Sequence, residues 1–176
     1  MKKETSWQYN ELNQVGTDYS DKSEVDIYDS RHSDFRDMEA ESLKILDDLW
    51  INSDHALIDF GSGTGTFAIH AARRCARVYA VDVSQAMIEH AEANAVRAGI
   101  TNIEFYNAGF LTYEHQDSPV DAIVTTFAFH HLPDFWKGIA LKRMNSMLKP
   151  NGQLYIHDVI LEEKDDIMDI ELSIRL

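Results

Sequence analysis

The stretch LIDFGSGTGT, residues 57–66, decides the fold of this chain. An apolar run ends at Phe60 and enters a loop of small residues, and an Ala-rich apolar stretch follows from Phe67. This order predicts a strand, a tight turn and a helix. Glycine permits backbone angles that side chains forbid, and it lets a ligand approach the main chain closely. The turn also directs N–H groups at the start of the helix beyond the strand, which favours a carboxylate or a phosphate.

The spacing of the glycines narrows the class of ligand. A dinucleotide fingerprint, G-x-G-x-x-G, would require glycine at position 66, where the chain has Thr66. A P-loop ends in Gly-Lys-Ser/Thr, and this loop has no such lysine. The alternative of a glycine-rich turn that holds no ligand remains open.

A second apolar run, residues 78–81, ends in Asp82. A carboxylate at the tip of a strand can accept hydrogen bonds from both hydroxyls of a ribose. The D-x-G-x-G-x-G pattern that starts at Asp59, together with Asp82, resembles the first two motifs of the class I S-adenosylmethionine-dependent methyltransferases. The resemblance implies S-adenosyl-L-methionine as the cofactor and S-adenosyl-L-homocysteine as the product.

The composition is that of a globular domain, with 44% hydrophobic and 26% charged residues in a chain of 176. A net charge of −14 opposes binding to the phosphates of nucleic acids and to anionic lipid. No apolar run reaches the roughly 20 residues of a membrane span, and the first residues lack the apolar core of a signal peptide. We therefore expect a cytoplasmic protein with no nucleic-acid or membrane partner. The single Cys75 is expected to serve packing.

Short apolar runs alternate with helical patterns along the chain, which predicts an α/β fold. We expect a Rossmann-like, doubly wound and mostly parallel sheet with helices on both faces and the site at the carboxyl ends of the strands. The expected strands are 56–60, 77–81, 103–106, 122–126 and 153–157. The expected helices are 33–51, with Ser33 or Asp34 as N-cap and Trp50 on its apolar face, the helix that starts at Phe67, 85–98 with Ser84 as N-cap, and 133–149.

The ends of the chain are less regular than its centre. We divide the chain into an N-terminal arm, residues 1–34, and an S-adenosylmethionine-binding domain, residues 35–176. The arm is either flexible, with one short helix near 23–30, or a lid that closes over a substrate. In the resembled family an antiparallel hairpin follows the fifth strand, and residues 159–176 are too few for a helix and both strands. We expect the hairpin to be missing and the fifth strand to have an open side, which would favour a homodimer or instability.

The resemblance assigns roles at the carboxyl ends of the strands. The glycine loop would hold the methionine end of the cofactor, Asp59 would help to order the loop and the ammonium, and Asp82 would bind the ribose. Asn107 stands where many relatives have an acid that accepts a hydrogen bond from the adenine amino group, and its amide oxygen can also accept. The predicted cofactor-binding set is Asp59, Gly61, Ser62, Gly63, Gly65, Asp82, Val83, Met87, Asn107, Ala108, Gly109 and Thr125, with Met87 equally suited to the core.

The segment TTFAFHHLPD, residues 125–134, looks like the corresponding part of small-molecule methyltransferases, including the quinone-biosynthesis type. Phe127 and Phe129 could line the pocket where a substrate meets the sulfonium, because aromatic faces attract cations. His130 is the candidate general base. We favour the alternative that it hydrogen-bonds the backbone at the helix entry, because methyl transfer often needs little beyond desolvation and alignment. The predicted substrate-binding set is Tyr19, Tyr28, Phe127, Phe129 and His130.

The predicted reaction is in-line SN2 transfer of a methyl group to a small-molecule acceptor. The protein would contribute proximity and a dry pocket. His157 and Asp158 are further candidates for substrate contact, and no metal site is expected. A non-catalytic protein that binds S-adenosylmethionine or S-adenosylhomocysteine, or serves as a scaffold, is an alternative with the same fold. A nicotinamide-dependent oxidoreductase is disfavoured by Thr66. The acceptor and the oligomeric state remain open.

Overall fold

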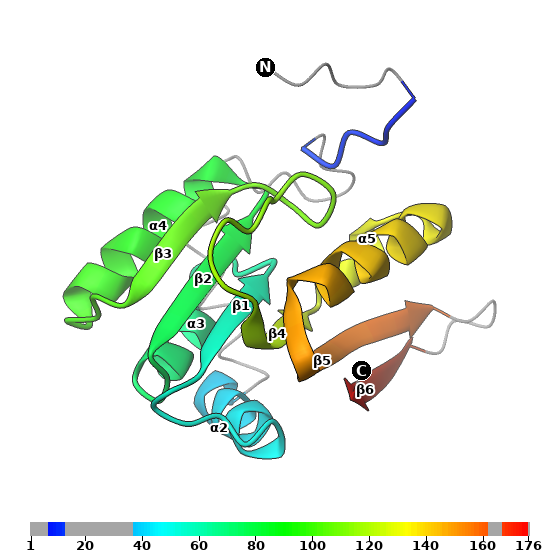
Figure 1. Ribbon diagram of the computed structural model, residues 1–176. Coiled ribbons are helices and arrows are strands. Elements are labelled where there is room, and N and C mark those ends of the chain that lie inside the picture. Colours follow the sequence, from blue (N-terminus) through cyan, green and yellow to red (C-terminus); the bar gives the residue numbers. More distant parts are fainter. Residues whose placement is uncertain (1–6, 13–36, 162–166, 176) are drawn as a thin grey trace.

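A computed structural model describes residues 7–12, 37–161 and 167–175 of the chain. The described residues contain one sheet with the strand order β3-β2-β1-β4-β5-β6 (Figure 1). Strands β1 to β5 run parallel to their neighbours, and β6 is antiparallel to β5. Their bounds are β1 (Ala56–Phe60), β2 (Arg77–Asp82), β3 (Ile103–Asn107), β4 (Val120–Thr126), β5 (Leu148–Leu161) and β6 (Ile167–Arg175). The five parallel strands confirm the predicted fold class.

The helices are α2 (Met38–Asp48), α3 (Thr66–Ala72), α4 (Gln85–Arg97) and α5 (Asp134–Met147), with a short 3₁₀ turn, η1 (Phe129–His131). The predicted cap of α4 is confirmed, because the Ser84 hydroxyl accepts a hydrogen bond from the Met87 N–H at 3.2 Å. The predicted start of the first helix is wrong. Asp37 caps α2 by accepting from the Ala40 N–H. Trp50 also lies past the end of α2, with a φ of +51° and 68% of its surface exposed.

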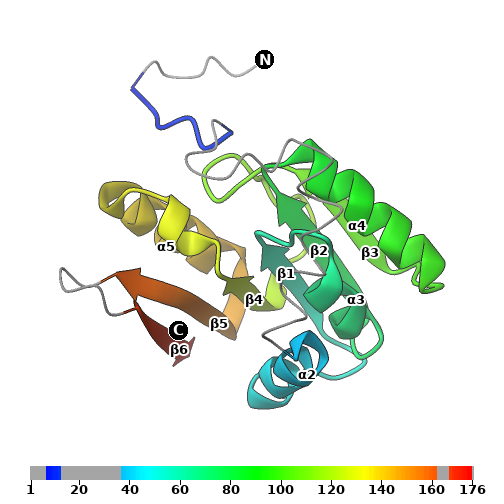
Figure 2. The ribbon, with the colours of Figure 1, turned by 180° about the vertical axis from the view of Figure 1, so that it is seen from behind.

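Two hydrophobic clusters fill the two faces of the sheet, as expected for parallel strands. On one face, α2 and α3 pack against residues such as Leu57, Val78 and Tyr155. On the other face, α5 and the segment after β3 pack against Ile58, Phe60 and Ile123. Figure 2 shows α3 and α4 together on the side of the sheet away from α5. Alternate residues of β1 thus serve opposite faces, which fixes its register.

The chain order of the strands reverses between β1 and β4, which are neighbours in the sheet. In open α/β sheets the connections on the two sides of such a point diverge, so ligands bind there at the carboxyl ends of the strands. The glycine loop follows β1, and the segment from Phe127 follows β4. The topology therefore places both segments at the edge where the sequence predicts a site.

The carboxyl-terminal part differs from the prediction. Strand β5 is longer than expected, and β6 pairs with it from Gln153↔Arg175 to Leu161↔Ile167. The expectation that the fifth strand has an open side is therefore wrong. Apolar and polar residues alternate through residues 168–175, a pattern of period two that suits a strand.

Candidate functional site

The turn between β1 and α3 requires glycine for two reasons. Gly61 has a φ of +72° and Gly65 a φ of +82°, a region that L side chains rarely adopt. A Cβ on Gly61 would also lie 2.3 Å from the Cβ of Ala128, which follows β4. The glycine loop and the segment after β4 are therefore in direct contact at the switch point.

The N–H groups of the glycine loop are largely occupied within the protein. Gly61 and Ser62 donate to the Val81 carbonyl at 2.8 and 3.1 Å. Gly63 donates to Oδ2 of Asp82 at 2.8 Å. These bonds fasten the loop to the end of β2. These three N–H groups thus hold the loop in place, and the side chains around the loop are candidates to bind a ligand.

Asp82 holds the loop and the start of α4 together. Its Oδ1 accepts from the Ser84 N–H at 2.8 Å, and its side chain lies in a buried position. Burial raises its pKa, and the N–H groups of Ser84 and Gly63 act in the opposite direction. Each carboxylate oxygen has a second lone pair, so both can still accept from the hydroxyls of a ribose.

Asp59 is 2% exposed near the carboxyl end of β1, and its Oδ2 has no hydrogen-bond partner. Burial and the negative charge of Asp82 raise its pKa to about 8. The ordering of the loop that the resemblance implied for Asp59 is performed in this structure by Asp82. Two neighbouring buried carboxyl groups, one with an unsatisfied oxygen, favour a ligand that carries positive charge.

Unsatisfied oxygens gather at this point of the sheet. Among the described residues, four buried side-chain atoms have no hydrogen-bond partner: Oδ2 of Asp59, Oγ of Ser62, Oγ1 of Thr125 and Nδ1 of His55. The first three belong to the predicted cofactor-binding set, and Phe60 and Thr125 are paired between β1 and β4. His55 precedes β1 and lies at the other edge. Because buried polar atoms are normally satisfied, the three oxygens indicate a polar ligand.

The loop after β3 lies beside the end of β2. The Asn107 side-chain amide donates to the Asp82 and Val83 carbonyls at 3.1 and 2.9 Å, and the Ala108 N–H also donates to Asp82. The amide oxygen of the exposed Asn107 is thus free of these bonds and can accept from a ligand. Met87 is 3% exposed in the first turn of α4, a core position. This placement leaves Val83 and the Asn107 loop as the predicted adenine contacts.

The two predicted pocket aromatics after β4 occupy different places. Phe127 is half-buried with a φ of +52°, and its ring lies 4.6 Å from the ring of His157. Such backbone strain in a residue other than glycine is common at functional sites. Phe129 is 8% exposed and packs edge-on against Phe110 in the core.

His130 binds a carboxylate, whereas the alternative favoured from the sequence was a bond from its ring to the backbone. The ring Nδ1 of His130 lies 2.5 Å from Oδ1 of Asp158, and the backbone N–H of His130 donates to Oδ2 at 2.8 Å. Asp158, in β5, lies in a largely buried position. Burial alone would raise its pKa, but the bonds from His130 and the Val159 N–H outweigh burial and lower the pKa. A carboxylate on Nδ1 fixes the tautomer that leaves Nε2 as an acceptor.

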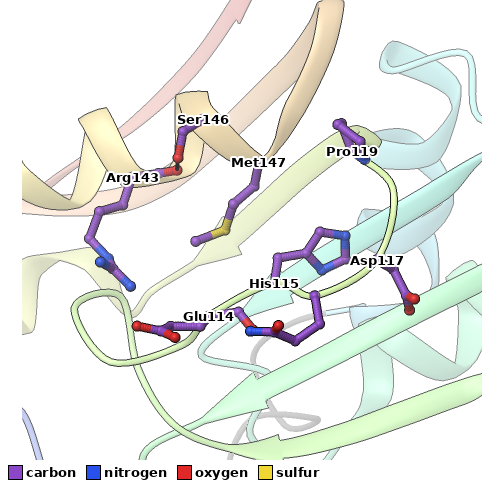
Figure 3. Close-up of a pocket in the computed structure, with 8 residues that line it drawn as sticks. Glu114, His115, Asp117, Pro119, Arg143, Ser146 and Met147 are labelled. Atoms are coloured by element: carbon purple, nitrogen blue, oxygen red, sulfur yellow. Dashed lines mark hydrogen bonds between the residues drawn. The ribbon is translucent and has the colours of Figure 1, made fainter. Parts of the chain in front are cut away.

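A separate pocket of about 310 Å³ lies between the segment that precedes β4 and the end of α5 (Figure 3). Its side chains include His115, Asp117, Arg143 and Met147. It lies at the amino end of β4, away from the glycine loop. No group of three or more metal-ligating side chains occurs within the described ranges, and no helix among them is long and apolar enough to cross a membrane.

A family model described as a methyltransferase domain matches residues 57–152, from β1 into β5. The chain belongs to this family. The class I resemblance based on Asp59, the glycine loop and Asp82 is confirmed. The similarity of residues 125–134 to the quinone-biosynthesis type stays a prediction.

Curated relatives carry the same description. The chain is 33% identical over 122 residues to an uncharacterized methyltransferase of Oceanobacillus iheyensis, covering 69% of this chain and 55% of that protein. It is 30% identical over 142 residues to one of Geobacillus kaustophilus, covering 80% and 62% of the two chains. The chain thus spans little more than half of the length of these relatives.

Solved structures share the fold. An S-adenosylmethionine-dependent methyltransferase from Aquifex aeolicus superposes with a TM-score of 0.64 at 27% identity, covering 83% of this chain and 77% of that chain. DhpI in a complex with SAM and HEP superposes with a TM-score of 0.65 at 26% identity, covering 81% and 64%. The family and these neighbours support S-adenosylmethionine as the cofactor, as the sequence predicts.

Proposed function

We propose that this chain transfers a methyl group from S-adenosylmethionine to a small-molecule acceptor by in-line displacement. The observation that carries the proposal is the group of buried, unsatisfied oxygens of Asp59, Ser62 and Thr125 at the switch point. When bound, the cofactor supplies a methyl group activated by a sulfonium. The protein supplies alignment and exclusion of water.

The two acidic side chains of the site match the positive charge of this cofactor. S-adenosylmethionine carries an ammonium and a sulfonium against one carboxylate, so its net charge is positive. Burial and the negative charge of Asp82 make Asp59 costly to ionise, and a cation beside Asp59 lowers that cost. Asp59 would hold the ammonium, Asp82 the ribose, and Asn107 the adenine amino group.

The acceptor side would be formed by the segment after β4 and the end of β5. The ring of Phe127 and the His130–Asp158 pair belong to these two elements. His130, oriented by Asp158, is the group that would take a proton from an acceptor that carries one. An acceptor that is already an anion would need only alignment.

The test is isothermal titration calorimetry with S-adenosylhomocysteine on the wild type and on Asp59→Asn. We expect micromolar binding by the wild type, weakened about tenfold (~1.4 kcal/mol) in the variant because the ammonium loses a charged acceptor. Asp54→Asn, at an exposed position before β1, is the matched control and should bind as the wild type does. No binding by the folded wild type would contradict the proposal.

Turnover separates the enzyme from the non-catalytic alternative. Wild type that binds S-adenosylhomocysteine is incubated with methyl-labelled S-adenosylmethionine and a panel of phenols, amines, thiols and carboxylates. Label in a product of any one class identifies the acceptor chemistry. Binding without turnover of any class would favour a binding or scaffold protein.

A further inference from the structure

The amino-terminal segment, residues 7–12, reaches the loop that follows β3, about one hundred residues later in the chain (Figure 1). Glu11 is only 7% exposed. Its carboxylate accepts from the Leu111 N–H at 2.8 and 3.1 Å and from the Thr112 hydroxyl at 2.8 Å. A buried carboxylate is costly without such donors, so this contact depends on the shape of the loop.

The same loop is also held by a cation. Arg143, in α5, donates from Nε to the Phe110 carbonyl at 3.2 Å and from Nη2 to the Tyr113 carbonyl at 2.6 Å. Glu11 thus accepts hydrogen bonds from Leu111 and Thr112, and Arg143 donates hydrogen bonds to two carbonyls of the same loop. Figure 3 shows the Arg143 side chain extending from α5 toward this part of the chain. In the geometry of this structure the loop satisfies both charged groups.

Glu11 also lies against the residues predicted to contact the adenine. A Cβ on Gly109 would lie 2.5 Å from Cδ of Glu11 and 2.7 Å from Cγ1 of Val83. Val83 in turn accepts from the Asn107 amide. Glu11, Gly109, Val83 and Asn107 therefore form one continuous set of contacts at the end of β2 and β3.

We propose that Glu11 is a positioning residue for the adenine side of the cofactor site, holding residues 109–112 in the arrangement that places Val83 and Asn107 for binding. The inference rests on the proposed function and extends it to the amino-terminal segment. Docking of residues 7–12 and cofactor binding require the same loop geometry. By linkage, each therefore strengthens the other.

The experiment titrates S-adenosylhomocysteine and adenosine separately into the wild type, Glu11→Ala, Glu11→Gln and Leu12→Ala. Glu11→Ala is expected to weaken both ligands by a similar factor, about tenfold, because both contain adenine. Glu11→Gln keeps an acceptor oxygen for Leu111 and Thr112 and should restore most of the affinity. Leu12→Ala, at an exposed neighbour of Glu11, should leave both affinities unchanged.

A second variant keeps the carboxylate and tests the packing of the whole set. Gly109→Ala should crowd both Glu11 and Val83 and weaken both ligands in the same ratio, whereas Glu11→Gln tests the carboxylate itself where Glu11→Ala fails to fold. Hydrogen exchange adds a second readout. S-adenosylhomocysteine should protect the amides of residues 8–12 in the wild type and not in Glu11→Ala.

The outcomes separate the two proposals. Wild type that binds no S-adenosylhomocysteine contradicts the proposed function. Wild type that binds, with Glu11→Ala and Gly109→Ala binding equally well, overturns the role of Glu11 and leaves the proposed function standing. A loss confined to S-adenosylhomocysteine, with adenosine unaffected, would also overturn it, because Glu11 would then act on the amino-acid end.

Discussion

Asp59 in β1 and Asp158 in β5 lie on strands that β4 separates, and their surroundings move their pKa values in opposite directions. Asp59 has an oxygen without a partner, and burial beside Asp82 raises its pKa to about 8. Asp158 accepts from three donors, and its pKa is lowered. The surroundings of Asp59 suit a residue that binds a cationic ligand. The surroundings of Asp158 suit a residue that orients a histidine.

Asp59→Asn should change how stability depends on pH. Because the pKa of Asp59 is raised from 3.8 to about 8 in the folded protein, its contribution is fully present below about pH 4 and is lost as pH rises through about 8. The melting temperature of the ligand-free wild type should therefore fall over this range more steeply than that of the variant. Melting curves between pH 5 and 8.5 check this, at about 2–4 °C for each kcal/mol in a domain of this size. Parallel curves would contradict the raised pKa.

Asp158→Asn should have the opposite dependence. The lowered pKa of Asp158 gives a contribution that is present above its unfolded value of 3.8 and is lost as pH falls through the folded value. We expect the variant to lose about 1–3 kcal/mol at pH 7, since hydrogen bonds to a charged group are replaced. Urea unfolding at pH 7 and pH 3 measures the difference, which should shrink at the lower pH. An equal loss at both would show that the charge is not involved.

At the scale of elements, the glycine loop between β1 and α3 is held by contacts that include β2 and the segment after β4. Val81 and Asp82 fix the loop from β2, and Ala128 contacts it from the segment after β4. The glycines are therefore needed for space as well as for backbone conformation.

A matched pair of substitutions separates these two needs. Gly61 and Gly99 have similar φ values of +72° and +69°, but a Cβ on Gly99 would meet nothing within 4 Å, whereas one on Gly61 would meet Ala128. Gly99→Ala should cost about 1 kcal/mol from backbone strain alone. Gly61→Ala should cost clearly more and should weaken S-adenosylhomocysteine binding. Equal losses in chemical denaturation would mean that the contact with Ala128 is easily relieved.

At the scale of the whole molecule, β6 decides whether the sheet ends in an exposed strand. It pairs with β5 along nine register positions, from Gln153 to Leu161. An uncovered β5 would present a row of free backbone groups to other chains.

Ending the chain after Leu161 should therefore promote self-association. We expect the chain of residues 1–176 to sediment as one species at a concentration at which the shortened chain forms larger species, because the β5 edge of the shortened chain is unprotected. Sedimentation velocity at several concentrations measures this. A shortened chain that stays in the same state as the chain of residues 1–176 would show that pairing by β6 does not limit association.

The sequence by itself determined the elements and the family. Local patterns carry this information: an apolar run before the glycines, Asp82 after a second run, and Ser84 as a helix cap each act over a few residues. Asp59, Ser62 and Thr125 could be named for the same reason, because topology brings the ends of parallel strands to one edge. The start of α2 was missed because Ser33, Asp34 and Asp37 stand within five residues and each can serve as an N-cap.

Only the tertiary structure decided which groups have partners. The sequence does not show that Asp82 fastens the loop while Oδ2 of Asp59 lacks a partner, that Phe129 enters the core while Phe127 is strained beside His157, or that β6 covers β5. Glu11 was missed altogether, because its partners Leu111 and Thr112 lie about one hundred residues away. Burial and hydrogen bonding at these sites depend on long-range packing, which no local pattern encodes.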